Sequence, residues 1–311
     1  ISLKGAAIDD LTFKNYRVSL ESDERVKLLA PRNIQDGYLI ESGFVTTDKN
    51  IEIPDADSVW TIVSGNKLTD QTPIKLQWTN TQGIIFEKEI SLDDKFLFTI
   101  NQKVINTTDK RYDFYSYGQI IRNKTPEISN FYILHEGLIA DLDGELIEED
   151  YDNIQEKKFT RTAQTGWLGI GDKYWITSLI PAKGKEFKTT FDYKKKYRAN
   201  FVSTEPQELL ENGTIQEEIQ VVVAAKRVNI IDGYAESLNI SKFDLVIDWG
   251  FLYFITKPLF FGIDYFFNLL GNYGLAIIAI TICIRLAFFP LANFHVFHHG
   301  LLQVISRPLA R

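Results

Sequence analysis

Sulfur-containing residues are almost absent from this sequence, which has no methionine and a single cysteine, Cys283. One cysteine cannot form an intramolecular disulfide, so cysteine usage does not reveal the redox compartment. The sequence has no initiator methionine, and residues 1–20 lack the basic and then apolar pattern of a signal peptide. We therefore expect an internal part of a longer protein, whose upstream signal anchor carries the large domain across a membrane.

Motifs for catalysis and metal binding are also scarce. The sequence has no nucleophile elbow, no phosphate-binding loop and no paired-cysteine metal site. His135, followed by Glu136, is more often structural than catalytic in a strand-rich region. Residues 141–145 resemble part of a calcium loop, but the glycine comes too early and the spaced glutamate is missing. We predict no catalytic residue, no metal and no cofactor; the tail histidines lack a nearby acidic residue to complete a site: His295, His298 and His299.

Acidic residues outnumber basic residues: 41 Asp and Glu residues against 34 Lys and Arg residues give a net charge of −7. The acidic excess lies in the first 244 residues, which makes nucleic acid an unfavourable partner. With 45% hydrophobic residues, the chain is long enough to bury one large core or two small ones.

Runs of β-branched and aromatic residues, separated by turn residues, follow one another from residue 74 to residue 225. Residues 96–104 alternate apolar and polar side chains, as in a strand with one buried face. So many strands predict an antiparallel β protein built as a large sandwich, to which residues 1–73 add further strands. The predicted strands include residues 74–79, 84–90, 96–106, 112–121, 173–180, 185–193 and 215–225.

An apolar run over residues 273–292 is long enough to cross a bilayer, and Arg285 lies inside it. A charged residue costs at least about 2.5 kcal/mol there, so it usually faces a partner helix or a wet cavity. Snorkelling to the nearer headgroups is the alternative, but several apolar residues follow Arg285 before the chain becomes polar.

Charges on either side of the apolar run predict its orientation. Arg307 and Arg311 follow it without an acidic residue, whereas Asp248 and Asp264 precede it against Lys257 alone. Because basic residues collect on the cytoplasmic side, the large N-terminal domain is predicted to lie outside the cytoplasm.

An aromatic, apolar segment carrying a polar stripe precedes the span, over residues 249–271. Lys257, Asp264 and Asn268 share one face of a helix, and Pro258 disfavours a straight crossing. A helix in the headgroup plane explains both the stripe and the aromatics, and a second crossing paired with the span is the alternative. The predicted membrane-interface residues are Trp249, Lys257, Pro258, Asp264 and Tyr273.

Residues 244–260 and 271–291 together resemble the YidC family of bacterial membrane protein insertases. The similarity covers an aromatic amphipathic segment, then Gly271-Asn-Tyr-Gly274, then an isoleucine-rich run that ends in Arg285 and Pro290-Leu291. Shorter segments upstream look like the large periplasmic domain of that family: residues 86–90, 114–119, 166–170 and 180–181.

This resemblance implies a β-supersandwich of the mutarotase type and a function in inserting and folding inner-membrane proteins. Arg285 then corresponds to the cation of a hydrophilic groove that contacts acidic residues of an incoming protein. No nucleotide or other cofactor is implied. The implied partners are nascent membrane proteins, the lipid bilayer, the Sec translocon and the ribosome, in the inner membrane with the large domain in the periplasm.

We accordingly expect a periplasmic β-sandwich over residues 1–243, an interfacial helix over 244–271, a transmembrane helix over 272–293 and an atypical cytoplasmic tail over 294–311. The family's groove needs five transmembrane helices and this chain carries one span, so a partial form is expected. The alternative functions are a membrane-anchored carbohydrate-binding module and a mutarotase-type enzyme, which usually draws on two histidines.

Overall fold

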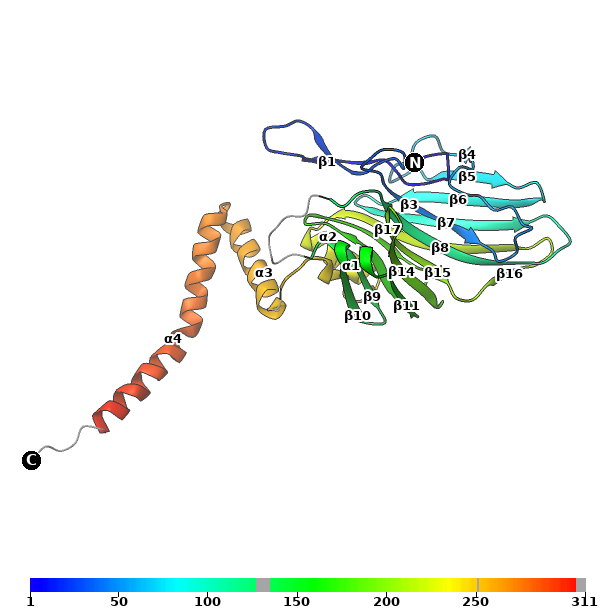
Figure 1. Ribbon diagram of the computed structural model, residues 1–311. Helices are drawn as coiled ribbons and strands as arrows, with labels where there is room; N and C mark the ends of the chain where they lie inside the picture. The colour runs from blue at the N-terminus through cyan, green and yellow to red at the C-terminus, as the bar shows by residue number, and fades with distance from the viewer. Residues whose placement is uncertain (127–134, 251, 306–311) are drawn as a thin grey trace, which may run out of the picture. The chain divides into compact units, whose positions relative to one another are not determined.

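The computed structural model describes residues 1–126, 135–250 and 252–305, with the backbone alone for residues 291–305. It divides into two compact units, Ile1–Asp248 and Trp249–Arg311. The first consists mainly of strands and the second of helices (Figure 1).

The first unit is a sandwich of antiparallel sheets, as predicted. Its described residues contain seventeen strands, arranged in a nine-stranded sheet, a six-stranded sheet and a separate two-stranded hairpin. The nine-stranded sheet has the order β10 (Glu145–Asp150), β9 (Gly137–Leu142), β12 (Gly166–Gly171), β13 (Trp175–Ile180), β17 (Thr214–Ala225), β7 (Leu97–Asn106), β6 (Ile84–Leu92), β5 (Ile74–Thr79) and β4 (Thr61–Ser64).

The six-stranded sheet is centred on β8 (Tyr112–Arg122), the second longest strand. One edge of β8 pairs with β3 (Tyr38–Val45), and the other edge pairs with β15 (Tyr197–Ser203) and then β16 (Gln207–Leu209). The sheet continues from β15 through β14 (Phe187–Tyr193) to β11 (Phe159–Ala163).

The N-terminal hairpin of β1 (Leu11–Arg17) and β2 (Arg25–Leu29) forms its own sheet rather than adding to the two main ones. Phe13 anchors it, because this buried ring stacks on Trp175 at 4.8 Å and contacts Phe96 edge-on at 5.7 Å. Strand β3 belongs to the six-stranded sheet and β4 to the nine-stranded sheet, so the prediction that residues 1–73 add strands to the sandwich is confirmed for these two strands.

Burial follows the alternation expected of strands. In β7 every second residue is buried, and Phe98, Ile100 and Val104 face the other sheet. Strands β9 and β12 are covered on both faces, and an apolar cluster on their outer side includes Trp167 and Ile176.

That outer cluster is completed by helix α2 (Val228–Ser237) and the 3₁₀ helix η1 (Phe243–Val246). Phe243 is fully buried and contacts the Trp167 ring at 5.1 Å. The predicted domain end at residue 243 thus falls at the first residue of η1, and the compact unit extends to Asp248 because η1 packs on the sheet. A short helix, α1 (Tyr151–Glu156), lies between β10 and β11.

The second unit contains helices α3 (Tyr253–Leu270) and α4 (Tyr273–Ile305). Gly271 ends α3 in the left-handed region at φ 66°, which glycine adopts readily, and Asn272 accepts the first hydrogen bonds of α4. Residues Tyr273–Pro290 are long and apolar enough to cross a membrane, with a mean hydropathy of 2.0. Residues 294–305 continue α4 without a break at the predicted boundary of residue 293; the three tail histidine side chains and residues 306–311 lie outside the described part.

Candidate functional site: the α3–α4 unit and the polar interior of the sandwich

Three of the five predicted interface residues, Trp249, Lys257 and Pro258, lie at or near the start of α3. Trp249 contacts Phe260 edge-on at 5.5 Å, and its carbonyl accepts a hydrogen bond from Thr256 Oγ1 at 2.8 Å. The Lys257 ammonium lies 5.8 Å from the centre of the Trp249 ring, within the range of a cation–π contact. Pro258 follows inside α3 and removes one helical hydrogen-bond donor, yet α3 continues through it.

In the C-terminal half of α3, the polar stripe forms as the spacing of its residues predicts. Asn268 Nδ2 donates to Asp264 Oδ2 at 3.3 Å, one helical turn apart. Tyr273, at the start of α4, stacks on Phe267 with ring centres 4.1 Å apart. This stack closes the turn between the helices.

Helix α3 packs against α4 on the other side of the turn that joins them. Gly262 comes so close to α4 that a side chain there would meet Ile280 Cδ1 at 2.7 Å, and Ala276 is 0% exposed. Small residues permit this approach, as in other apolar helix pairs. The interfacial placement of α3 and the second-crossing alternative both stay predictions, since both can accommodate this contact.

Arg285 lies on the opposite face of α4. It follows Ala276 by nine residues, which is about 180° around an α-helix at about 100° per residue. The side chain is exposed, and among the described residues no carboxylate lies within ion-pair distance of it. A lone cation therefore projects from the face of the span that α3 leaves open.

The backbone next to Arg285 is polar as well. Pro290 has no N–H, so the Leu286 carbonyl four residues earlier lacks its helical donor. Thr281, one turn before Arg285 on the same side, donates its hydroxyl to the Ile277 carbonyl at 2.7 Å. Arg285 and the carbonyl of Leu286, which lacks its helical donor, are thus adjacent in the sequence of an otherwise apolar segment, where each favours water or a polar partner.

The interior of the sandwich contains a row of polar side chains on three neighbouring strands. Strand pairing places Lys88 opposite Gln102, and Gln102 opposite Glu217. We call these three residues the polar row. It separates the largest apolar cluster from the one around Phe86 and Phe114.

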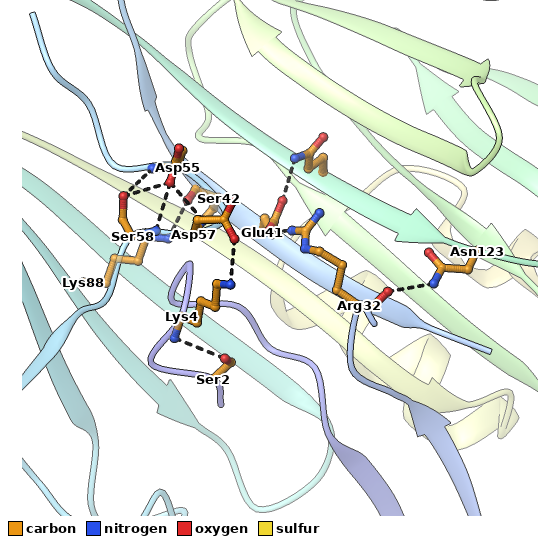
Figure 2. Close-up of polar contacts among 11 residues, drawn as sticks. Ser2, Lys4, Arg32, Glu41, Ser42, Asp55, Asp57, Ser58, Lys88 and Asn123 are labelled. Atoms are coloured by element: carbon orange, nitrogen blue, oxygen red, sulfur yellow. Dashed lines mark hydrogen bonds and ion pairs between the residues drawn. The ribbon is translucent and has the colours of Figure 1, made fainter. Parts of the chain in front are cut away.

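Partners within the fold satisfy the charges of the polar row. Lys88, 3% exposed, donates to the Ser42 carbonyl at 2.5 Å, as Figure 2 shows, and its ammonium lies 5.1 Å from the Trp60 ring. Burial lowers the pKa of Lys88 to about 7. Glu217 accepts hydrogen bonds from Lys185 Nζ and Gln207 Nε2, each at 2.5 Å, and from Ser116.

A second buried carboxylate, Glu41, is paired with Arg32 and accepts a hydrogen bond from Gln119 at 2.7 Å (Figure 2). The cavity beside Lys88 and Gln102 measures about 20 Å³, room for about one water molecule. A sugar ring does not fit there, so the polar row contributes to the interior of the fold and forms no substrate pocket.

His135 is also engaged within the domain. Its Nδ1 lies 3.4 Å from Asp150 Oδ1, and its Nε2 lies 3.3 Å from the Leu138 carbonyl oxygen. The His135 backbone N–H donates to Asp248 Oδ2 at 3.3 Å, which fixes the point where the chain leaves the domain. The Asp141–Glu145 segment forms the turn between β9 and β10, with Asp143 and Gly144 at positive φ.

A sequence model of the family described as "YidC periplasmic domain" matches residues 1–261, most of the chain. The chain belongs to the YidC periplasmic domain family. Within the membrane protein insertases named YidC, that of Pelagibacter ubique is 68% identical over 311 residues, which cover all of this chain and 56% of the relative. The YidC insertase of Agrobacterium fabrum is 36% identical over 301 residues, covering 94% of this chain and 50% of the relative.

The chain thus spans about half the length of these YidC relatives. A galactose mutarotase related enzyme from Lactobacillus acidophilus has the same fold, with a TM-score of 0.50 over 72% of this chain and 93% of that enzyme. Because only 12% of the residues are identical, this similarity establishes the mutarotase-like fold alone.

Proposed function

We propose that this chain supplies the periplasmic domain and one membrane span of an insertase that helps inner-membrane proteins to insert and fold. The observation that carries the proposal is the position of Arg285, alone and exposed on the α4 face opposite Ala276. A membrane span with a single unpaired guanidinium is unfavourable unless water or an anionic partner reaches it.

In this mechanism Arg285 attracts acidic residues in the short external tail of an incoming protein. The attraction is strong because the surroundings are apolar. Burial of the substrate's own apolar segment in the bilayer then drives insertion, so no nucleotide or cofactor is required. Further helices of the whole protein enclose the groove on the Arg285 side, and no step involves enzymatic bond cleavage.

The proposed topology places residues 1–243 in the periplasm, residues 244–271 at the membrane interface, residues 272–293 in the inner membrane and residues 294–311 in the cytoplasm. The charge distribution around the span supports this orientation. Proposed partners are nascent membrane proteins and lipid, with the Sec translocon and the ribosome for substrates that use them.

Complementation of insertase-depleted cells tests the proposal. The chain is expressed as it stands and extended by the segments that the Pelagibacter ubique relative has in addition, each with Arg285 or Arg285→Ala. We expect rescue by the extended Arg285 version alone. Arg285→Lys should retain part of the activity because it keeps the charge, and Leu286→Ala is a control at an exposed apolar position of the same helix.

Equal rescue by the extended Arg285→Ala version for all substrates would refute the role of the cation. Rescue by the short chain would refute the requirement for several core helices. Membrane levels of each variant, measured by immunoblot, distinguish loss of activity from loss of protein.

A carbohydrate-binding function is the second candidate, favoured by one depression on the domain. Its volume is about 430 Å³, and aromatic and charged side chains line it, among them Tyr16, Tyr174, Trp175 and Asp248. Titration of the chain with mono- and disaccharides, followed by tryptophan fluorescence, tests it. Saturable quenching that is lost in Trp175→Ala would support this function, and unchanged fluorescence would exclude it.

A further inference from the structure

Five lysines gather at one end of the six-stranded sheet, in a domain that is acidic as a whole. Three of them form the turn between β14 and β15, and two follow α1 directly before β11. Since β11 pairs with β14 from Phe159 and Phe191 onward, the two groups lie on neighbouring strands near the same turn. We call them the lysine patch: Lys157, Lys158, Lys194, Lys195 and Lys196.

The turn itself is poorly suited to lysine. Lys195 has a φ of 65°, in the left-handed region where glycine or asparagine is favoured, and Lys194 N–H bonds the Lys196 carbonyl at 3.1 Å across it. Three adjacent ammonium groups also repel one another. Neither feature stabilises the fold, so the structure of the turn gives no reason for three adjacent lysines.

The patch is available for an anionic partner. All of its side chains except that of Lys196 are exposed, and among the described residues none of the five lies within ion-pair distance of a carboxylate. Asp152 and Glu156 are exposed on the neighbouring helix α1, and Asp192 is occupied by Arg198 Nε at 2.7 Å. Five cations outnumber the three carboxylates of Asp150, Asp152 and Glu156, which leaves a local positive charge.

A chain of contacts connects the patch to the point where the polypeptide leaves the domain. Asp248 accepts a hydrogen bond from His135, and the His135 ring contacts Asp150, which directly precedes α1. Helix α1 is six residues long and ends just before Lys157. Its Tyr151 and Gln155 contact Tyr197, which ends the turn of the other three lysines.

The patch therefore lies at the same end of the domain as Asp248, the last residue of the compact unit. Helix α3 begins at Tyr253, five residues after Asp248, so at about 3.5 Å per residue it starts within about 18 Å of that exit point. A cationic surface that comes within about 8 Å of a bilayer, the Debye length at physiological salt, is attracted by acidic lipids.

We infer that the lysine patch binds the headgroups of anionic phospholipids in the membrane that the chain's own span enters. Binding fixes this end of the domain against the bilayer surface. The exposed Tyr193 ring, which contacts Tyr197 at 4.7 Å, lies beside the turn and suits the headgroup region.

Lysine footprinting of the full chain in nanodiscs tests the inference. The chain is reconstituted in phosphatidylcholine alone and in phosphatidylcholine with phosphatidylglycerol, acetylated briefly, and analysed by mass spectrometry. With phosphatidylglycerol, we expect the patch lysines to react about fivefold more slowly, the ratio that corresponds to ~1 kcal/mol of attraction per lysine. High salt should abolish the difference.

Lys49 and Lys110 serve as internal controls, because they are exposed in loops at the opposite end of β3 and β8. Their reactivity should be the same in both lipids. A Lys194→Gln/Lys195→Gln variant should reduce protection of Lys157 and Lys158, whereas Lys49→Gln/Lys110→Gln should not. Equal reactivity of the patch in both lipids would overturn the inference and favour an acidic protein partner, and so would protection by phosphatidylcholine alone, which carries no net charge.

Discussion

In residues 1–248 the buried charges of Lys88, Glu41 and Glu217 have partners within the fold, whereas in the helical unit the one guanidinium of the span, Arg285, is exposed on an apolar helix. Glu217 and Glu41 each accept several hydrogen bonds from neighbouring strands. Only 6% of the 18-residue span is buried within the protein. The comparison indicates that the strand-rich unit satisfies these charges internally, while the apolar surface of the span is left largely uncovered by the protein.

The largest expected effect concerns the core on the outer face of the nine-stranded sheet. Trp167→Ala removes a fully buried indole that packs on Phe243 and donates to the Ser241 carbonyl at 3.0 Å. We expect the free energy of unfolding of the domain to fall by about 3–5 kcal/mol in a denaturant titration. Tyr174→Ala, at a 60% exposed ring, should change it by less than about 0.5 kcal/mol. A similar loss in both variants would contradict the proposed packing.

The second prediction concerns the free energy of membrane insertion, which the charge of Arg285 makes less favourable. Arg285→Leu should make insertion of the Tyr273–Pro290 segment more favourable by about 3 kcal/mol in a glycosylation-based insertion assay, because a charge leaves the apolar region. The unfolding free energy of the domain should not change. If insertion is equally efficient with Arg285 and with Leu, the guanidinium already reaches the headgroups and the snorkelling alternative is correct.

The third prediction concerns the pH dependence of domain stability. Burial lowers the pKa of Lys88 to about 7 in the folded state, against 10.5 in the unfolded chain. Between these values the unfolded state binds more protons, so the contribution of Lys88 to stability increases as the pH rises from 7 to 10.5. Relative to Lys88→Met, the protein should gain about 2 kcal/mol in unfolding free energy between pH 7.5 and 9.5.

The comparison with Lys88→Met removes the contribution to the pH dependence of all titrating groups that both proteins share. Lys226, whose pKa burial lowers to about 8, is one of them. Parallel pH profiles for the two proteins would mean that water reaches Lys88 and that the polar row is less enclosed than its contacts indicate.

The smallest expected effect tests the contact between α2 and the nine-stranded sheet. Tyr234 donates to Asp93 Oδ2 at 2.7 Å and accepts from the Phe96 N–H at 2.8 Å. Tyr234→Phe should lower the unfolding free energy by about 1–2 kcal/mol, the effect of losing hydrogen bonds at a buried site. Tyr193→Phe, at an exposed ring, provides the matched control, and equal values for the two variants would argue against the α2 contact.

Much of the fold was predictable because strand periodicity is local. Residues 74–79 and 112–121 were expected as strands and correspond to β5 and β8. The N-terminal hairpin was harder to place, because its attachment depends on Phe13 contacting Trp175, far away in the sequence.

The candidate site was predictable only in part. Arg285 and the stripe of Asp264 and Asn268 follow from composition and helical spacing. The contact of Gly262 with Ile280 does not, although small residues in two successive apolar helices are the signal that could have indicated it. The lysine patch was missed because its two parts are more than 30 residues apart.

The sequence alone determined the strands, the membrane span and the presence of one cation within it, because these depend on repeats of two or 3.6 residues and on the cost of burying charge. Only the tertiary structure decided which side chains meet. The register of β6, β7 and β17 aligns Lys88, Gln102 and Glu217, and the packing of α3 on Ala276 leaves Arg285 on the open face. Such contacts join residues distant in the chain, so their position depends on which strands and helices pair and not on local periodicity.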